Sequence, residues 1–156
     1  MQSTSNRVPD HTAEEINRRI ERETEIRLSY YAANPGEIGA RLVALDEEWD
    51  IERALEANAA SLALAGVALG AAVDRRWLVL PALVTAFLLQ HAMQGWCPPL
   101  PVLRRMGFRT AAEIGRERYA LKALRGDFDR MAEAEDKLSM VLRAVGLRRS
   151  GTAYQS

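Results

Sequence analysis

Two long uncharged runs follow each other in the middle of the chain, and they constrain its fold more than any other feature. Residues 57–73 and 77–103 contain no Asp, Glu, Lys or Arg, and only Asp74–Arg76 separates the two runs. An α-helix rises about 1.5 Å per residue, so crossing a hydrocarbon core about 30 Å thick takes about 20 residues, with about 17 as the lower limit. Both runs reach this length. We therefore expect a transmembrane helical hairpin over 57–97, with spans at about 57–73 and 77–96.

Tryptophans mark both ends of the second span. Trp77 and Trp96 are 19 residues apart, which corresponds to about 28 Å of helix, and tryptophan is enriched at both interfaces of a membrane. We assign the two side chains to those interfaces. The alternative is a pair of buried helices in a soluble protein, and the 27 uncharged residues from 77 to 103 argue against it.

The flanks of the hairpin carry opposite charges, although the whole chain is balanced at 21 basic and 21 acidic residues. Residues 1–56 contain 7 basic and 13 acidic side chains (net −6), and residues 104–156 contain 12 and 7 (net +5). Basic residues beside a membrane exit attract anionic lipid, at about 1 kcal/mol each, and the basic block lacks aromatic platforms for nucleic-acid bases. We expect a membrane contact, with Arg104 and Arg105 at the interface, and no nucleic-acid partner.

Arginines near the spans predict the orientation of the hairpin, because basic residues accumulate on the cytoplasmic side. Arg75 and Arg76 lie in the turn between the spans. Six arginines lie outside the spans but within about 20 residues of them, the distance over which the rule applies: Arg41, Arg53, Arg104, Arg105, Arg109 and Arg116. The six arginines outside the spans outnumber the two in the turn, which predicts that both termini lie in the cytoplasm.

The flanks are expected to be helical, which makes the fold class all-α. Thr12-Ala-Glu-Glu15 and Thr110-Ala-Ala-Glu113 have the spacing of capping boxes, which predicts helix starts near residues 13 and 111. The first helix is expected to end at residue 33, and a second, restarting near Pro35, to continue without a break into the first span. The expected organisation is a disordered lead over 1–12, an acidic helical region over 13–56, the hairpin over 57–97, a basic helical region over 98–147 whose last helix ends near Gly146, and a disordered tail over 148–156.

Small residues gather on one side of the first span. Gly66 and Gly70 are one helical turn apart, and Ala59 and Ala63 lie on the same side. Such a face lets a neighbouring helix approach to backbone contact. It packs either against the second span of the same chain or against a second copy, and the residues alone favour neither.

Polar side chains interrupt the last turns of the second span. Gln90, His91 and Gln94 would be costly if left unsatisfied in a membrane. They provide either a proton or ligand contact, or an interfacial or interhelical hydrogen bond, which is the more common role. His11 and His91 are too few and too far apart for a recognisable metal site, and we expect no metal and no cofactor.

Cys97 is the only cysteine, so an intrachain disulfide is excluded. Its place next to Trp96, near the expected cytoplasmic interface, permits a redox, lipidation or persulfide-carrying thiol. A small packing residue at the helix exit explains it equally. The absence of a second thiol or a nearby histidine favours the inert role.

The string Gly95-Trp96-Cys97-Pro98, together with Gly66-x-x-x-Gly70 and with Trp77 opening the second span, resembles the YgaP-like transmembrane domain of bacterial inner-membrane proteins. The resemblance covers about residues 55–107 and implies a multi-pass hairpin of the inner membrane that tends to self-associate. In the namesake protein this domain is attached to a rhodanese. These 156 residues contain no rhodanese segment and a single cysteine, so sulfur transfer does not carry over.

The function expected from these features is structural. No phosphate loop, catalytic triad or pair of buried carboxylates is recognisable, so we do not expect an enzyme. We expect an inner-membrane hairpin protein that acts as an accessory, scaffold or oligomerisation module, with the bilayer and either a second copy or another membrane protein as partners. The alternative is a redox or sulfur-handling membrane protein that uses Cys97.

Overall fold

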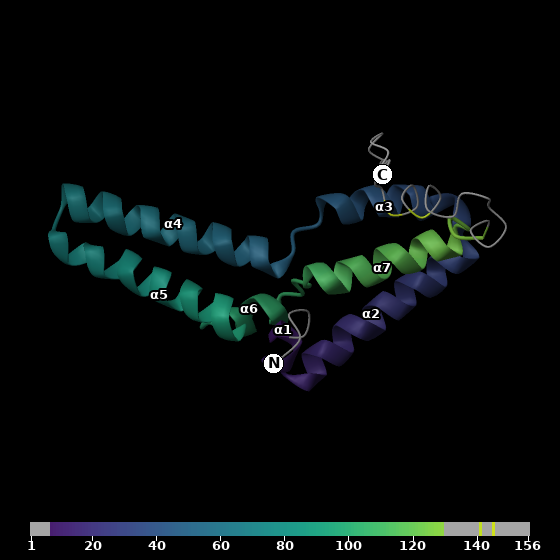
Figure 1. Cartoon of the computed structure of the whole chain (residues 1–156), viewed down its shortest axis with the longest axis horizontal. Coiled ribbons are helices and arrows are strands. Elements are labelled where there is room, and N and C mark those ends of the chain that lie inside the picture. Colours follow the sequence, from purple (N-terminus) through teal and green to yellow (C-terminus); the bar gives the residue numbers. More distant parts are fainter. Residues whose placement is uncertain (1–6, 130–140, 142–144, 146–156) are drawn as a thin grey trace, which may run out of the picture.

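The computed structural model describes residues 7–129 together with 141 and 145, and the regular elements in these residues are all helical (Figure 1). The all-α fold class is confirmed. The expected helix ending near Gly146 falls largely outside the described residues, and the tail over 148–156 falls entirely outside them. In chain order the elements are α1 (Arg7–Asp10), α2 (Glu14–Ala33), η1 (Pro35–Glu37), α3 (Ile38–Glu47), α4 (Ile51–Ala72), η2 (Arg75–Leu78), α5 (Val79–Gln94), α6 (Leu100–Arg105) and α7 (Ala111–Leu124).

The helices α4 and α5 run antiparallel as a hairpin that projects to one side of the molecule (Figure 1). The 22 residues of α4 extend over about 33 Å, close to the thickness of a hydrocarbon core. Two helical stretches, Pro35–Ala72 and Arg75–Gln94, are long and apolar enough to cross a membrane by length and composition, and the apolar window of the second has no buried residue. The two expected spans therefore exist as helices.

Local hydrogen bonds define both ends of α5. At the tip of the hairpin, the Asp74 carboxylate accepts from the Arg76 N–H at 2.8 Å and starts the turn of η2. At the base, Gly95 adopts a left-handed conformation with φ 77°, and its N–H donates to the His91 carbonyl. Glycine adopts this conformation without the steric cost that other residues pay.

A second unit, which we call the helical layer, consists of α2, α3 and α7. The central element is α7, which contacts both α2 and α3 (Figure 1). Its apolar stripe is built on spacings of three and four residues, as expected for a helix packed on one face. The buried core of the layer consists of Ile38, Leu42, Leu45, Ile114 and Leu121, with Leu28 and Tyr31 packed against it.

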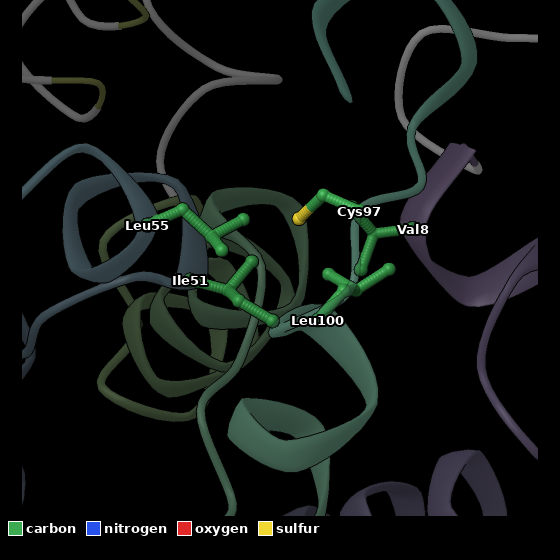
Figure 2. Packing of buried hydrophobic residues seen from close by; sticks show 5 residues of the cluster. All are labelled: Val8, Ile51, Leu55, Cys97 and Leu100. Atoms are coloured by element: carbon green, nitrogen blue, oxygen red, sulfur yellow. The ribbon is translucent and has the colours of Figure 1, made fainter. Parts of the chain in front are cut away.

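A separate apolar cluster, which we call the junction cluster, lies where the hairpin meets the helical layer. It brings together residues from α1, α4, α6 and the connection after α5 (Figure 2). Ile51 and Leu100 are completely buried there. The full set is Val8, Ile51, Leu55, Cys97 and Leu100, with Trp96, Leu103 and Phe108 packed against it.

The second helix does not continue into the first span as expected. It ends at Glu47, and α4 begins at Ile51, with three residues between them. The Asp50 carboxylate caps α4 by accepting from the Arg53 N–H at 2.8 Å, and the Ile51 N–H donates to the Arg109 carbonyl, also at 2.8 Å. Residues 40–65 contain no glycine or proline, so Asp50, a favoured cap residue, was the one local signal for the break.

The start of the chain also differs from expectation. Residues 7–10 form α1, and Val8 is buried in the junction cluster, so the disordered lead does not extend through residue 12. Thr12 does not cap α2, because its hydroxyl donates to the Val8 carbonyl at 2.7 Å, and Ala13 occupies the cap position. The second capping box is confirmed at the start of α7.

Candidate functional site

A buried carboxylate, that of Glu117, lies at the centre of the helical layer. Its side chain is completely buried in α7. Arginines from three other segments donate to its carboxylate: Arg41 of α3 through Nε at 2.8 Å, Arg27 of α2 through Nε at 3.3 Å, and Arg109 through Nη1. One carboxylate thus joins α2, α3 and α7.

Glu48 extends this group, which we call the Glu117 cluster. Its two carboxylate oxygens accept from Nε and Nη2 of Arg109, both at 2.7 Å, in the paired geometry that arginine and carboxylate favour. A longer ion pair joins Glu48 to Arg41 at 3.6 Å. Two carboxylates therefore face three guanidinium groups in the cluster, which leaves one net positive charge.

Burial and pairing act in opposite directions on the Glu117 cluster. Burial opposes ionisation of Glu117, but the hydrogen bonds from Arg41 and Arg109 outweigh it and hold the pKa of this carboxyl below its usual range. Burial also opposes the charge of Arg109, and the hydrogen bonds to Glu48 and Glu117 nevertheless raise its pKa. The pairing therefore favours the charged forms of Glu117 and Arg109 despite their burial.

A second buried arginine, Arg104, ties the hairpin to the helical layer. It lies at the end of α6, and both of its Nη atoms donate to Glu113 of α7, at 2.7 and 2.9 Å. It also donates to Asn17 of α2 at 2.9 Å and to the Phe108 carbonyl at 3.1 Å. The expectation that Arg104 lies at the membrane interface is wrong, because its side chain is completely buried in this link.

Glu113 has two roles at this link. It accepts from Arg104 and, at 2.8 Å, from the Thr110 N–H, while the Thr110 hydroxyl accepts from the Glu113 N–H at 3.1 Å. Burial opposes its ionisation, yet the bonds from Arg104 and Thr110 hold its pKa below the usual range. The start of α7 is thus fixed to the end of α6.

Within the hairpin, the small-residue face of α4 packs against the same chain. A Cβ atom added at Gly66 would lie 2.5 Å from Pro81 Cδ, and one added at Gly70 would lie 2.7 Å from Leu78 Cδ2. A residue with a side chain at either position would fit only if atoms of Pro81 or Leu78 moved away. Both glycines are therefore used within the chain, at the tip half of the hairpin.

The base half of the hairpin is less tightly packed. A cavity of about 140 Å³ lies between α4 and α5. Ala59 of the small-residue face lines it, as does Cys97, whereas Ala63 is half-buried between the cavity and the glycines. Further apolar residues lining it are Leu55, Leu62, Val84, Phe87 and Leu88.

Cys97 is buried in the junction cluster, and its sulfur points toward Leu55 (Figure 2). Burial raises the pKa of this thiol, and the backbone hydrogen bond from Leu100 offsets the effect only in part. The reactive form of a cysteine is the thiolate. The environment of Cys97 therefore disfavours nucleophilic and redox chemistry at neutral pH.

The polar residues near the end of α5 differ in exposure. Gln90 and His91 are half-buried and Gln94 is exposed. Their spacing of one, three and four residues places them on neighbouring positions of one side of the helix. His91 Nδ1 is buried and has no hydrogen-bond partner within the described part of the chain. In residues 7–129 no group of His, Cys, Asp and Glu is arranged to hold a metal ion.

The remaining residues assigned to the interface lie at the two ends of the hairpin. Trp77 is 45% exposed at the tip. Trp96 is half-buried at the base and packs on the junction cluster. Arg105 is exposed at the end of α6, and its carbonyl accepts from Arg19 at 2.9 Å.

The Glu117 cluster was not predicted from the sequence. One signal was present: Ile114, Glu117 and Leu121 have the three- and four-residue spacing of a single helix face, so the glutamate occupies a core position of an apolar stripe. A carboxylate at such a position requires buried cationic partners. Which arginines supply them depends on the tertiary fold.

No protein-family model, curated protein or solved structure matches this chain, so the comparisons identify no related protein. The resemblance to the YgaP-like transmembrane domain thus stays a prediction.

Proposed function

We propose that this chain is a non-enzymatic protein of the bacterial inner membrane, in which the hairpin α4–α5 anchors the helical layer as an accessory or scaffold module. The observation that carries the proposal is the apolar exterior of the hairpin. Leu64 is 71% exposed, Leu89 62% and Val79 60%. Soluble monomers rarely expose contiguous apolar surface of this extent, and lipid provides the cover that the chain itself does not.

The packing of the helical layer supports a topology with both flanks on one side. Arg27 of α2 and Arg41 of α3 precede the hairpin and Glu117 of α7 follows it, yet both arginines donate to this carboxylate. Two crossings return the chain to its starting side. The excess of arginine outside the spans favours the cytoplasm as that side.

The basic residues after the hairpin support a role without nucleic acid. Arg104 and Arg109 are buried, and Arg118 pairs with Asp46 at 2.6 Å, so these three guanidinium groups neutralise carboxylates of the same chain. Phosphate recognition needs exposed positive charge. The partner we propose instead is a second copy of the chain or another membrane protein.

The redox or sulfur-handling alternative finds little support. Cys97 is 3% exposed, and burial raises the pKa of its thiol. A reactive cysteine requires a lowered pKa and access for its substrate.

Membrane anchoring is tested with two arginine substitutions at matched exposure. Leu64 lies in the middle of α4 and is 71% exposed, and Val43 lies in α3 and is 59% exposed, so neither substitution removes a buried contact. A charge at the centre of a span costs about 2.5–3.5 kcal/mol. We expect Leu64→Arg to release a large part of the protein from membranes washed with alkaline carbonate, and Val43→Arg to stay in the membrane like the wild type.

Extraction of the wild-type chain by carbonate would contradict anchoring, and so would equal behaviour of the two variants. The orientation is tested separately. A reporter that is active only in the periplasm, fused after Ser156, should give no signal, and a strong signal would reverse the proposed sides.

A further inference from the structure

We propose that Trp49, Val102 and Met106 form a second lipid-contacting surface, which rests in the headgroup region of the phospholipid bilayer. We call it the basal patch. The proposal rests on the proposed anchoring of α4 and α5. The sequence predicted a lipid contact of Arg104 at this end of the hairpin, but that side chain is buried.

The three side chains are exposed and come from two connections that meet at the base of the hairpin. Trp49, in the break between α3 and α4, is 46% exposed, whereas Val102 of α6 is 56% and Met106 69% exposed. Trp49 and Met106 line one shallow hollow of about 250 Å³, together with Phe108. Val102 lies one helical turn before Met106, so both face the same side of α6.

The position of the basal patch along the hairpin matches the depth of a membrane interface. Trp49 lies two residues before α4, which extends over about 33 Å to the tip. A hydrocarbon core is about 30 Å thick. With the charged turn Asp74–Arg76 outside the core at one end, the base of α4 reaches the headgroups at the other end.

The chemistry of the patch fits this depth. The Arg53 guanidinium lies 4.4 Å from the centroid of the Trp49 ring, which places a positive charge directly over an exposed indole. Indoles favour the boundary between headgroups and acyl chains, and arginine attracts anionic headgroups. Arg105 adds a second exposed positive charge on α6. Glu47, Glu48 and Asp50 flank Trp49, and Glu48 lines the same hollow, so the patch carries charges of both signs. The hydrated headgroup region keeps these charges solvated, whereas an apolar protein surface would desolvate the charge of Arg53.

Depth-dependent quenching of single tryptophans tests the proposal on the full chain. Trp77→Phe and Trp96→Phe leave Trp49 as the reporter, in vesicles of phosphatidylcholine and phosphatidylglycerol in equal parts. The phosphatidylcholine carries bromine either near the headgroup or near the end of the acyl chain. We expect about twofold stronger quenching by the shallow bromine, because an interfacial indole stays near the headgroups.

Two matched reporters separate this proposal from the anchoring on which it rests. Phe87→Trp, in a chain with no other tryptophan, reports on the hairpin and should be quenched most by the deep bromine. Val43→Trp, in the same background, reports on an exposed site of α3 away from the hairpin and should be quenched by neither. Quenching of Trp49 no stronger than that of Val43→Trp overturns the basal patch, whereas an unquenched Phe87→Trp overturns the anchoring itself.

A second measurement covers the case in which Trp96→Phe disturbs the junction cluster. In a Cys97→Ser chain that keeps its tryptophans, a nitroxide is attached at Met106→Cys and its collisions with oxygen and with a water-soluble nickel chelate are compared. Oxygen is enriched in the bilayer and the chelate in water, so a label at the interface should show a higher ratio of oxygen to chelate collisions than a label in water. A ratio equal to that of a Val43→Cys control overturns the proposal.

Discussion

Replacing Glu117 with glutamine removes one negative charge from the centre of the helical layer while preserving the volume of the side chain. The carboxylate is completely buried and is the shared acceptor of Arg27, Arg41 and Arg109. Removing one partner of a buried ion pair costs about 3–5 kcal/mol. We place Glu117→Gln at the lower end, about 3 kcal/mol, because Glu48 still pairs with Arg109 and Arg41, and the side chain of Arg27 is 29% exposed to water.

Amide hydrogen exchange on the full chain in detergent micelles measures this cost segment by segment. A loss of about 3 kcal/mol corresponds to about hundredfold faster exchange, and we expect it in α2, α3 and α7 but not in the hairpin. The matched control is Glu14→Gln, which breaks an exposed pair with Arg18 at one turn's spacing. Such pairs contribute at most about 0.5 kcal/mol.

The pH dependence of amide exchange provides an independent test of the same reasoning. In the folded chain the pKa of Glu117 lies below its ordinary value, so its ionised form stabilises the fold above the ordinary glutamate pKa of about 4.3. That stabilisation is lost as the pH falls through the lowered pKa. The wild type should therefore lose protection in acid more steeply than Glu117→Gln. Parallel acid curves, or exchange in Glu117→Gln no faster than in Glu14→Gln, would refute the reasoning.

Three further predictions follow from single contacts. Thr110→Ala removes the hydroxyl that caps Glu113, and should speed exchange in the first turn of α7 by an amount equivalent to about 1 kcal/mol; unchanged exchange there contradicts it. Gly95→Ala should expose α1 to protease more than Gly107→Ala, since both residues have positive φ but only a Cβ at 95 would meet α1, 2.5 Å away; equal cleavage contradicts it. Cys97 should react with iodoacetamide much more slowly in micelles than after denaturation, because burial raises its pKa; similar rates would revive the thiol hypothesis.

The parts of the fold that follow local rules were predictable from the sequence. The length of the uncharged runs is enough to indicate two helices joined at Asp74–Arg76, and the Thr110 capping box depends only on residues three apart. The same spacing at Thr12 did not produce a cap: Ala13 occupies the cap position of α2, and the Thr12 hydroxyl donates to the Val8 carbonyl four residues earlier. A capping motif predicts a helix start only where its side chain has no better partner.

The candidate site depended on information that no local pattern carries. The charges of α2 look like those of a solvated helix, and nothing near Arg27 indicates that it contacts a glutamate 90 residues later. Arg104 shows the same difficulty: an arginine next to a membrane exit normally faces the headgroups, and here it is buried by partners on α2 and α7.

The long sequence separation within the Glu117 cluster has a kinetic consequence. Arg27 and Arg41 precede Glu117 by 90 and 76 residues, and the entire hairpin is made in between. At roughly 5–20 residues per second, the ribosome needs about 4 to 18 seconds to deliver their partner. During this time α2 and α3 have exposed apolar faces, and Arg27 and Arg41 lack the Glu117 carboxylate, so completion of the helical layer waits until α7 has emerged.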